Sequence, residues 1–158
     1  MLLKELHLSR RRLPYTKSYM VRSGYERLIK THTNKCIKPN RSIPFYKGLF
    51  EYFGYKVIFE NEGFLGLGNG DHSVWFLKTV PEFASIPYNR DGTGLNHFGI
   101  HVESKEDVDK FHKEFMKPRN IKPEFGTPKE GPEFGTYYQV MFLGPDNIAL
   151  EVVYTHHE

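Results

Sequence analysis

The chain has 158 residues, of which 39% are hydrophobic and 15% aromatic, and this suits one globular domain with an appendage. No apolar run approaches the ~20 residues that a membrane-spanning helix needs, so we expect no membrane association. The single cysteine, Cys36, excludes an internal disulfide and is typical of a cytoplasmic protein, which is the location we predict.

Charge divides the chain into two parts. Residues 1–41 contain eleven Lys and Arg and two acidic residues, whereas residues 42–158 contain eleven and seventeen, giving net charges of +9 and −6. We predict a basic N-terminal extension over residues 1–30, as an arm or a disordered segment, and one domain over residues 31–155. The extension lacks the apolar segment of an export signal. Because no folded nucleic-acid-binding motif accompanies it, we expect no nucleic-acid partner.

The first predicted element of the domain is a helix over residues 43–53. Apolar residues recur at helical spacing from Ile43 to Phe53. Ser42 can cap the start of this helix, and Gly54 is well placed to end it. Three strands are predicted to follow, over residues 56–60, 64–67 and 73–78, with Asn69-Gly70 as a hairpin turn.

The second half of the domain predicts a strand, a helix and three further strands. Every second residue from Phe98 to Val102 is apolar, as in a half-buried strand over residues 95–103. Ser104 and Asp107 form a capping box ahead of the helix. The further strands are predicted over residues 122–125, 137–142 and 149–154.

The two halves share one order of elements. A shift of 65 residues superposes the apolar positions of the first helix on those of the second, and it places His32 at the position of His97. A strand around His32 should therefore precede the first helix. Two related modules of this kind can share one core and bring equivalent strand residues to a common centre.

Four segments together resemble the vicinal oxygen chelate superfamily, which includes glyoxalases, bleomycin resistance proteins and extradiol dioxygenases. They are residues 41–47 (RSIPFYK), 95–102 (LNHFGIHV), 137–142 (YYQVMF) and 144–154 (GPDNIALEVVY). The resemblance implies an α+β fold in which paired βαβββ modules form a half-open, eight-stranded mixed β-barrel flanked by helices. It also implies a homodimer and a small-molecule substrate bound through a divalent metal, although some members bind ligands without metal.

By position, the resemblance implies that His32, His97 and Glu151 are metal ligands, and that Glu151 is also a catalytic base when substrate displaces it. Two imidazoles and one carboxylate suit Fe, Mn, Zn or Ni with open coordination positions, and neither the identity of the metal nor its presence is fixed by the sequence. The glyoxalase I pattern has another glutamate on the last strand of the first module. Residues 73–78 contain no carboxylate, so we do not expect typical glyoxalase I activity.

Strand alternation predicts the faces on which these side chains lie. His97 should lie on the face opposite Phe98, and Glu151 on the face opposite Leu150 and Val152. A carboxylate among apolar residues is costly to bury unless it is paired or metal-bound. The structural alternatives are a hydrogen-bonded core histidine and a glutamate paired with Lys or Arg.

Trp75, Phe76, Tyr138 and Met141 are predicted to line a substrate cavity, with core packing as the alternative. We expect a metal-dependent lyase, isomerase, dioxygenase or thiol transferase that acts on a small oxygenated substrate. The alternative is a metal-free protein of the bleomycin-resistance type, which binds a drug or antibiotic.

Overall fold

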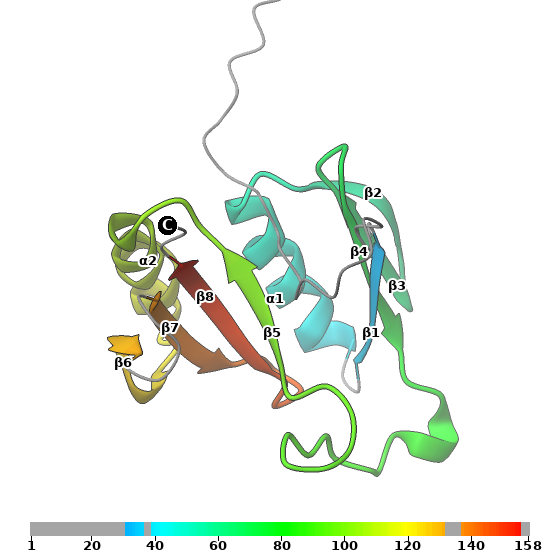
Figure 1. Cartoon of the computed structure of the whole chain (residues 1–158). Coiled ribbons are helices and arrows are strands. Elements are labelled where there is room, and N and C mark those ends of the chain that lie inside the picture. The colour runs from blue at the N-terminus through cyan, green and yellow to red at the C-terminus, as the bar shows by residue number, and fades with distance from the viewer. Residues whose placement is uncertain (1–30, 37–38, 132–136, 156–158) are drawn as a thin grey trace, which may run out of the picture.

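The computed structural model describes residues 31–36, 39–131 and 137–155, and of residues 31–36 it describes only the backbone. It contains two modules, each with one strand, one helix and three further strands (Figure 1). The predicted N-terminal extension, residues 1–30, lies outside the described residues.

The first module comprises β1 (Thr31–Cys36), α1 (Pro39–Tyr52), β2 (Lys56–Asn61), β3 (Phe64–Gly68) and β4 (Ser73–Lys78). The second comprises β5 (His97–His101), α2 (Lys105–Phe111), β6 (Pro123–Gly131), β7 (Tyr137–Leu143) and β8 (Ala149–Thr155). The described residues also form three short helical turns: η1 (Pro81–Phe83) between the modules, and η2 (His112–Met116) and η3 (Lys117–Arg119) after α2.

Each module forms its own four-stranded mixed sheet. The strand order is β1-β4-β3-β2 in the first sheet and β5-β8-β7-β6 in the second. In each sheet the first and last strands of the module pair in parallel, and the other neighbours are antiparallel. The predicted α+β class and paired modules are therefore confirmed. The described strands pair within these two sheets and do not close into one barrel.

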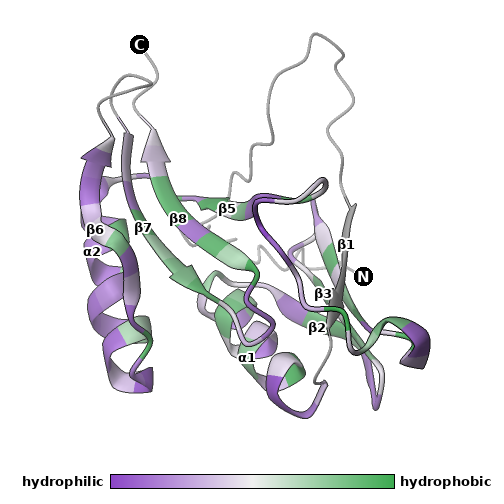
Figure 2. Cartoon of the chain, turned by 90° about the horizontal axis from the view of Figure 1, so that it is seen from below, coloured by the Kyte–Doolittle hydropathy of each residue, from purple (hydrophilic) through white to green (hydrophobic). Residues whose placement is uncertain are grey.

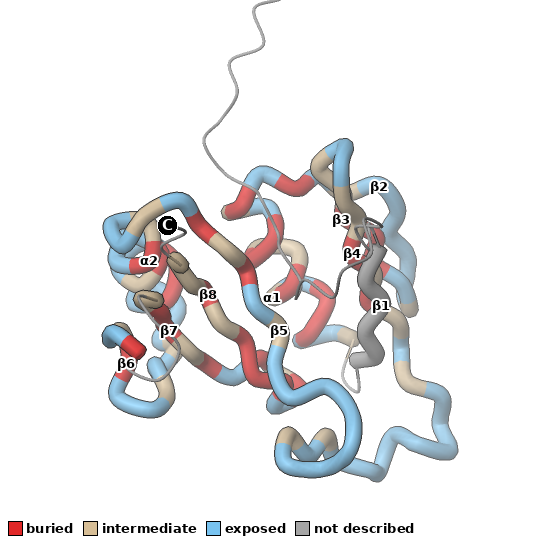
Figure 3. The backbone as a smooth tube through the Cα atoms, viewed as in Figure 1, coloured by how far each residue is buried: buried red, intermediate tan, exposed pale blue. Residues whose placement is uncertain are grey.

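Helix α1 lies between the two sheets and contributes to the core of both modules (Figure 1). Tyr46 stacks on Phe76 of β4 with ring centroids 4.0 Å apart. Phe53 stacks on Phe111 of α2 at 5.3 Å. Buried positions follow α1 and the strands that flank it (Figure 3). The sheet faces that meet the helices are thus the inner faces of the molecule. Along β8, one hydrophilic position stands between hydrophobic ones (Figure 2).

The two helices begin in different ways. Helix α1 begins at Pro39, earlier than the predicted residue 43, because the fixed φ of proline suits a first helical position. Ser42 is buried inside this helix and does not cap it. The capping box of α2 is confirmed, since Ser104 Oγ accepts a hydrogen bond from Asp107 N at 3.2 Å. Of the helices in the described ranges, none is both long and apolar enough to cross a membrane.

Candidate functional site

His97 and Glu151 lie together on the outer face of the second sheet, which is the face turned away from α1 and α2. Strands β5 and β8 run parallel with Gly99 opposite Glu151, so His97 is diagonal to the carboxylate. The distance from His97 Nε2 to Glu151 Oε2 is 3.3 Å, and the two side chains are 40% and 13% exposed. Leu150 and Val152, which flank Glu151 in sequence, are buried. The side chains therefore alternate between the two faces of β8 as strand periodicity requires.

Gly99 leaves the space that the Glu151 carboxylate occupies. A Cβ atom at this position would lie 3.3 Å from Glu151 Oε2, which is tighter than most real contacts of this kind. A larger residue would require the carboxylate to shift slightly. Glycine therefore allows the carboxylate to lie over β5, beside the imidazole of His97.

Asn96 orients the ring of His97. His97 Nδ1 and Asn96 Oδ1 are 2.9 Å apart, and Asn96 Nδ2 donates to the carbonyl oxygen of Arg90 at 3.3 Å. Because the amide nitrogen faces a carbonyl group, the amide oxygen faces His97 and accepts a hydrogen bond from Nδ1–H. In the neutral ring the lone pair is then on Nε2, which faces Glu151 and is available to a ligand or a proton.

The neighbouring carboxylate raises the pKa of His97 above its ordinary value. The main cause is the hydrogen bond between the imidazolium and Glu151, which raises the pKa. Partial burial of the ring lowers the pKa, the negative charge of Glu151 raises it, and the positive charge of Arg90 lowers it. A metal ion needs the neutral imidazole, so a proton and a metal would compete for Nε2.

The spacing of the two side chains fits two ligands of one metal ion. Two donor atoms about 2.1 Å from zinc, at the tetrahedral angle, lie ~3.4 Å apart, close to the 3.3 Å between Nε2 and Oε2. Imidazole and carboxylate are donors that Fe, Mn, Zn and Ni all accept. Among the described side chains, no group of three or more His, Cys, Asp or Glu residues could hold a metal. A third protein ligand would therefore have to come from elsewhere.

His32 lies in β1, at an edge of the first sheet, where its backbone pairs with Val74. Val74 is one of the buried residues of β4 and lies on the inner face of its sheet. His97 instead pairs with Ala149, which is two residues before Glu151 and therefore on the same face of β8 as the carboxylate. The backbone register therefore assigns His32 to an inner-face position and His97 to an outer-face position. A shift of β1 by one residue would assign His32 to the outer face instead. The side chain of His32 is outside the described side chains, so its role as a ligand stays a prediction.

Two of the four predicted cavity residues lie on the outer faces. Met141 pairs with Glu151 between β7 and β8, so it borders the His97–Glu151 pair. Trp75 lies on the outer face of the first sheet, where its ring covers Gly66. Only Met141 is thus a direct neighbour of the pair.

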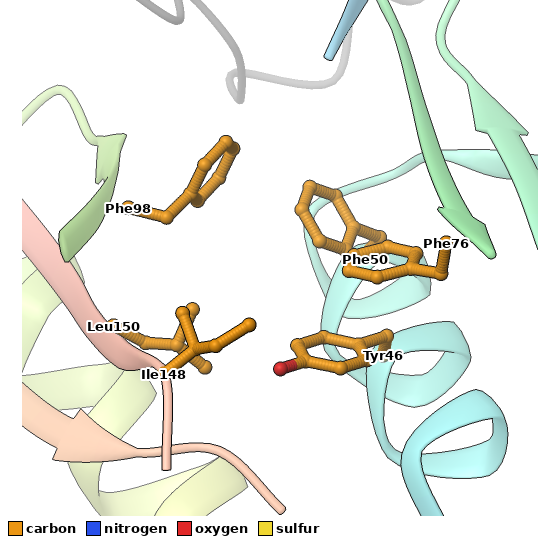
Figure 4. A pocket seen from close by; sticks show the side chains of 6 residues that line it. All are labelled: Tyr46, Phe50, Phe76, Phe98, Ile148 and Leu150. Atoms are coloured by element: carbon orange, nitrogen blue, oxygen red, sulfur yellow. The ribbon is translucent and has the colours of Figure 1, made fainter. Parts of the chain in front are cut away.

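The other two lie on the inner side of the sheets. Phe76 lines a cavity of about 10 Å³ between residues of α1 and residues of the second module (Figure 4). That volume suffices for about one water molecule. Tyr138 donates to Asp109 Oδ1 of α2 at 2.8 Å. Both positions are separated from His97 and Glu151 by the thickness of a sheet.

The sequence reasoning missed Asn96, Gly99 and Arg90. Strand parity could have identified Gly99, which shares a face with His97 and is the smallest residue on it. Asn96 precedes His97 directly, but its contact depends on the folding of the segment between the modules. Arg90 lies within that segment, which has no periodic pattern from which its position could be inferred.

The chain is similar in structure to a candidate glyoxalase from Bacillus halodurans, with a TM-score of 0.73 and 23% identity over 82% of this chain and 97% of that one. It is also similar to a glyoxylase/bleomycin resistance protein/dioxygenase domain from Frankia sp. EAN1pec. The TM-score is 0.65 and the identity 19%, over 84% of this chain and 94% of that one. A third similar structure is a glyoxalase/bleomycin resistance protein/dioxygenase family enzyme from Burkholderia phytofirmans PsJN. Its TM-score is 0.60 and the identity 18%, over 80% of this chain and 98% of that one. No family model matches the chain, and no curated protein matches its sequence. At these identities the likeness establishes the fold.

Proposed function

We propose that this chain, which has the fold of the glyoxalase/bleomycin resistance/dioxygenase structures, is a metal-dependent enzyme acting on a small oxygenated substrate. His97 and Glu151 are the protein ligands at its centre. The observation that carries the proposal is the 3.3 Å between His97 Nε2 and Glu151 Oε2 on an outer sheet face. The reaction is of the lyase, isomerase, dioxygenase or thiol transferase type.

A bound divalent ion would supply a Lewis acid that polarises a substrate oxygen. The contribution of the chain is to position the groups around it. Asn96 holds the imidazole of His97 with Nε2 toward Glu151, and Gly99 lets the carboxylate approach. Met141 places a flexible apolar side chain beside the carboxylate. These residues support a site in which two ligands are held before substrate arrives.

Glu151 is also the proposed general base. Its side chain is 13% exposed and lies against the imidazole of His97. A substrate oxygen that takes the place of the carboxylate would leave Glu151 free beside the substrate. The carboxylate would then be within reach of a proton on the adjacent substrate atom, as general base catalysis requires.

Metal analysis of the purified protein tests the proposal. We expect about one divalent ion per chain by inductively coupled plasma mass spectrometry, and loss of that ion in His97→Ala and in Glu151→Gln. His112→Ala is the matched control, because His112 begins η2 behind the second sheet. A wild-type protein that stays metal-free after incubation with Fe, Mn, Zn and Ni in turn would contradict the proposal.

The same measurement addresses the third ligand. His32→Ala should lower zinc affinity less than His97→Ala does, because the β1 register gives the two histidines opposite parity. Equal losses of affinity would place His32 in the metal site and would require β1 to pair one residue out of its present register.

A second candidate function is metal-free binding of a drug-like small molecule. It is favoured by an aromatic patch on the outer face of the first sheet, which we define as Ile58, Phe59, Phe64 and Trp75. The first three are 55%, 46% and 42% exposed, and the ring of Phe59 lies 6.3 Å from that of Trp75. Such a surface suits a planar cation, as does the net charge of −6 over residues 42–158. A metal-free protein that binds a planar cationic drug would favour this function.

We also propose that the protein forms a homodimer that covers the aromatic patch. Contiguous exposed apolar residues commonly mark a protein interface, and most soluble oligomers are symmetric homodimers.

A further inference from the structure

Arg90 is held beside His97 by the segment that links the two modules. The carbonyl oxygen of Arg90 accepts the hydrogen bond from Asn96 Nδ2 at 3.3 Å, so the residue that orients His97 is itself anchored to Arg90. The hydroxyl of Tyr88 contacts the carbonyl oxygen of Asn96 at 2.9 Å. The segment is therefore closed on itself immediately before β5, and Arg90 stands next to the site.

The guanidinium of Arg90 extends toward the opposite edge of the second sheet. Its Cζ atom lies 4.9 Å from the centroid of the Phe125 ring, which is a cation–π contact. Phe125 has a φ of 55° and lies at the register irregularity of β6, where its side chain is exposed. Because β5 and β6 are the two edges of this sheet, the contact directs the Arg90 side chain from one edge toward the other.

Arg90 brings a positive charge into the neighbourhood of His97 and Glu151. Within the described residues its ion pair is with Asp91, at 3.3 Å between Nε and Oδ1. The Asp91 side chain is 77% exposed and that of Arg90 is 33% exposed. An exposed pair of this kind contributes little stability. The carboxylate of Asp91 can therefore give way to a carboxylate from a ligand.

We infer that Arg90 is a specificity-determining residue that binds a carboxylate of the substrate, at the end remote from the oxygens that chelate the metal. The planar guanidinium can pair with a carboxylate through two parallel hydrogen bonds. Away from the metal, the net charge of −6 over residues 42–158 would otherwise disfavour a second carboxylate. The inference rests on the proposed function for the position of the substrate, and it names the class: a small oxo or hydroxy acid with a second carboxylate.

Matched 2-oxo acids test the inference by isothermal titration calorimetry, with and without zinc. The pairs are oxaloacetate and 2-oxobutyrate, 2-oxoglutarate and 2-oxopentanoate, and 2-oxoadipate and 2-oxohexanoate, which differ only by a terminal carboxylate in place of a methyl group. In at least one pair, wild-type protein should bind the dicarboxylate about tenfold more tightly or better. Arg90→Gln should abolish this preference, and Arg90→Lys should retain part of it.

Lys129→Gln is the matched control, because it removes the same charge from an exposed position of β6 and should leave the preference unchanged. Thermal unfolding of each variant verifies that it is folded. Equal affinities within every pair, absence of binding included, would overturn the inference, and so would an unchanged preference in Arg90→Gln. Failure of wild-type protein to bind any of Fe, Mn, Zn and Ni would overturn the proposed function instead, because the metal-free titrations still measure the pairing with Arg90.

Discussion

The outer faces of the two sheets have different chemistry although the sheets have the same strand order. The first sheet presents the aromatic patch around Phe59 and Trp75, whereas the second presents His97 and Glu151. The inner faces are alike, since both are apolar and pack on the helices. The shared core constrains the residues on the inner face of each strand. The outer-face residues that alternate with them are free to differ between the two sheets. A duplicated module thus keeps its framework in both copies, and one copy carries the candidate chemistry.

The comparison predicts that inner positions determine stability and outer positions do not. Phe111 is fully buried, and its ring lies 5.3 Å from Phe53 and 5.5 Å from Phe142. Phe111→Ala should therefore lower the free energy of unfolding by about 3–5 kcal/mol. Trp75→Ala should lower it by about 1 kcal/mol, because Trp75 is partly exposed. Urea denaturation followed by circular dichroism measures both, and similar losses would break the distinction between the two faces.

A smaller effect, on zinc affinity, should distinguish the outer face of the second sheet from the rest of the surface. Asn96→Ala removes the acceptor for His97 Nδ1, so zinc affinity should fall by about 10- to 100-fold, whereas Asn96→Asp keeps an acceptor and should retain affinity. Asn61→Ala is the control, because it also removes one side-chain acceptor, that of Gly63 N, but on the first sheet. Zinc affinity that is unchanged in Asn96→Ala would show that the contact does not position His97.

The smallest expected effect concerns pH in the metal-free protein. Because the folded-state pKa of His97 is raised by Glu151, the stabilising pair is fully present below the unfolded value of about 6.5 and is lost as pH rises through the higher folded value. Wild-type protein should therefore exceed Glu151→Gln in Tm by roughly 2 °C more at acidic than at alkaline pH. NMR titration should also give a lower His97 pKa in the variant. A Tm difference that grows with pH would contradict the pairing.

Much of the fold could be predicted because its signals are local. The alternation in β5, the hairpin at Asn69-Gly70 and the capping box at Ser104 each depend on neighbouring residues, and each predicted element is present. β6 was predicted over residues 122–125 but runs from Pro123 to Gly131, because its register irregularity and its polar composition give no periodic signal.

The site could be predicted only where strand parity determines it. Parity placed His97 and Glu151 on faces opposite their apolar neighbours, and the parallel pairing of β5 with β8 brings them together. Parity could not place Arg90, which precedes β5 in an irregular segment. Parity also could not determine the face on which His32 lies. The 65-residue shift superposes the two helices but does not determine the register of the strands ahead of them, and a slip of one residue moves a side chain to the other face.

The position of α1 determines how the two halves depend on each other. Its Tyr46 completes the interior of one half, and its Phe53 completes that of the other. The contact of Phe53 with Phe111 crosses between the halves, so each half alone would leave apolar surface uncovered. A chain cleaved between β4 and β5 would yield two fragments with complementary apolar surfaces, which would regain native structure only by reassociating.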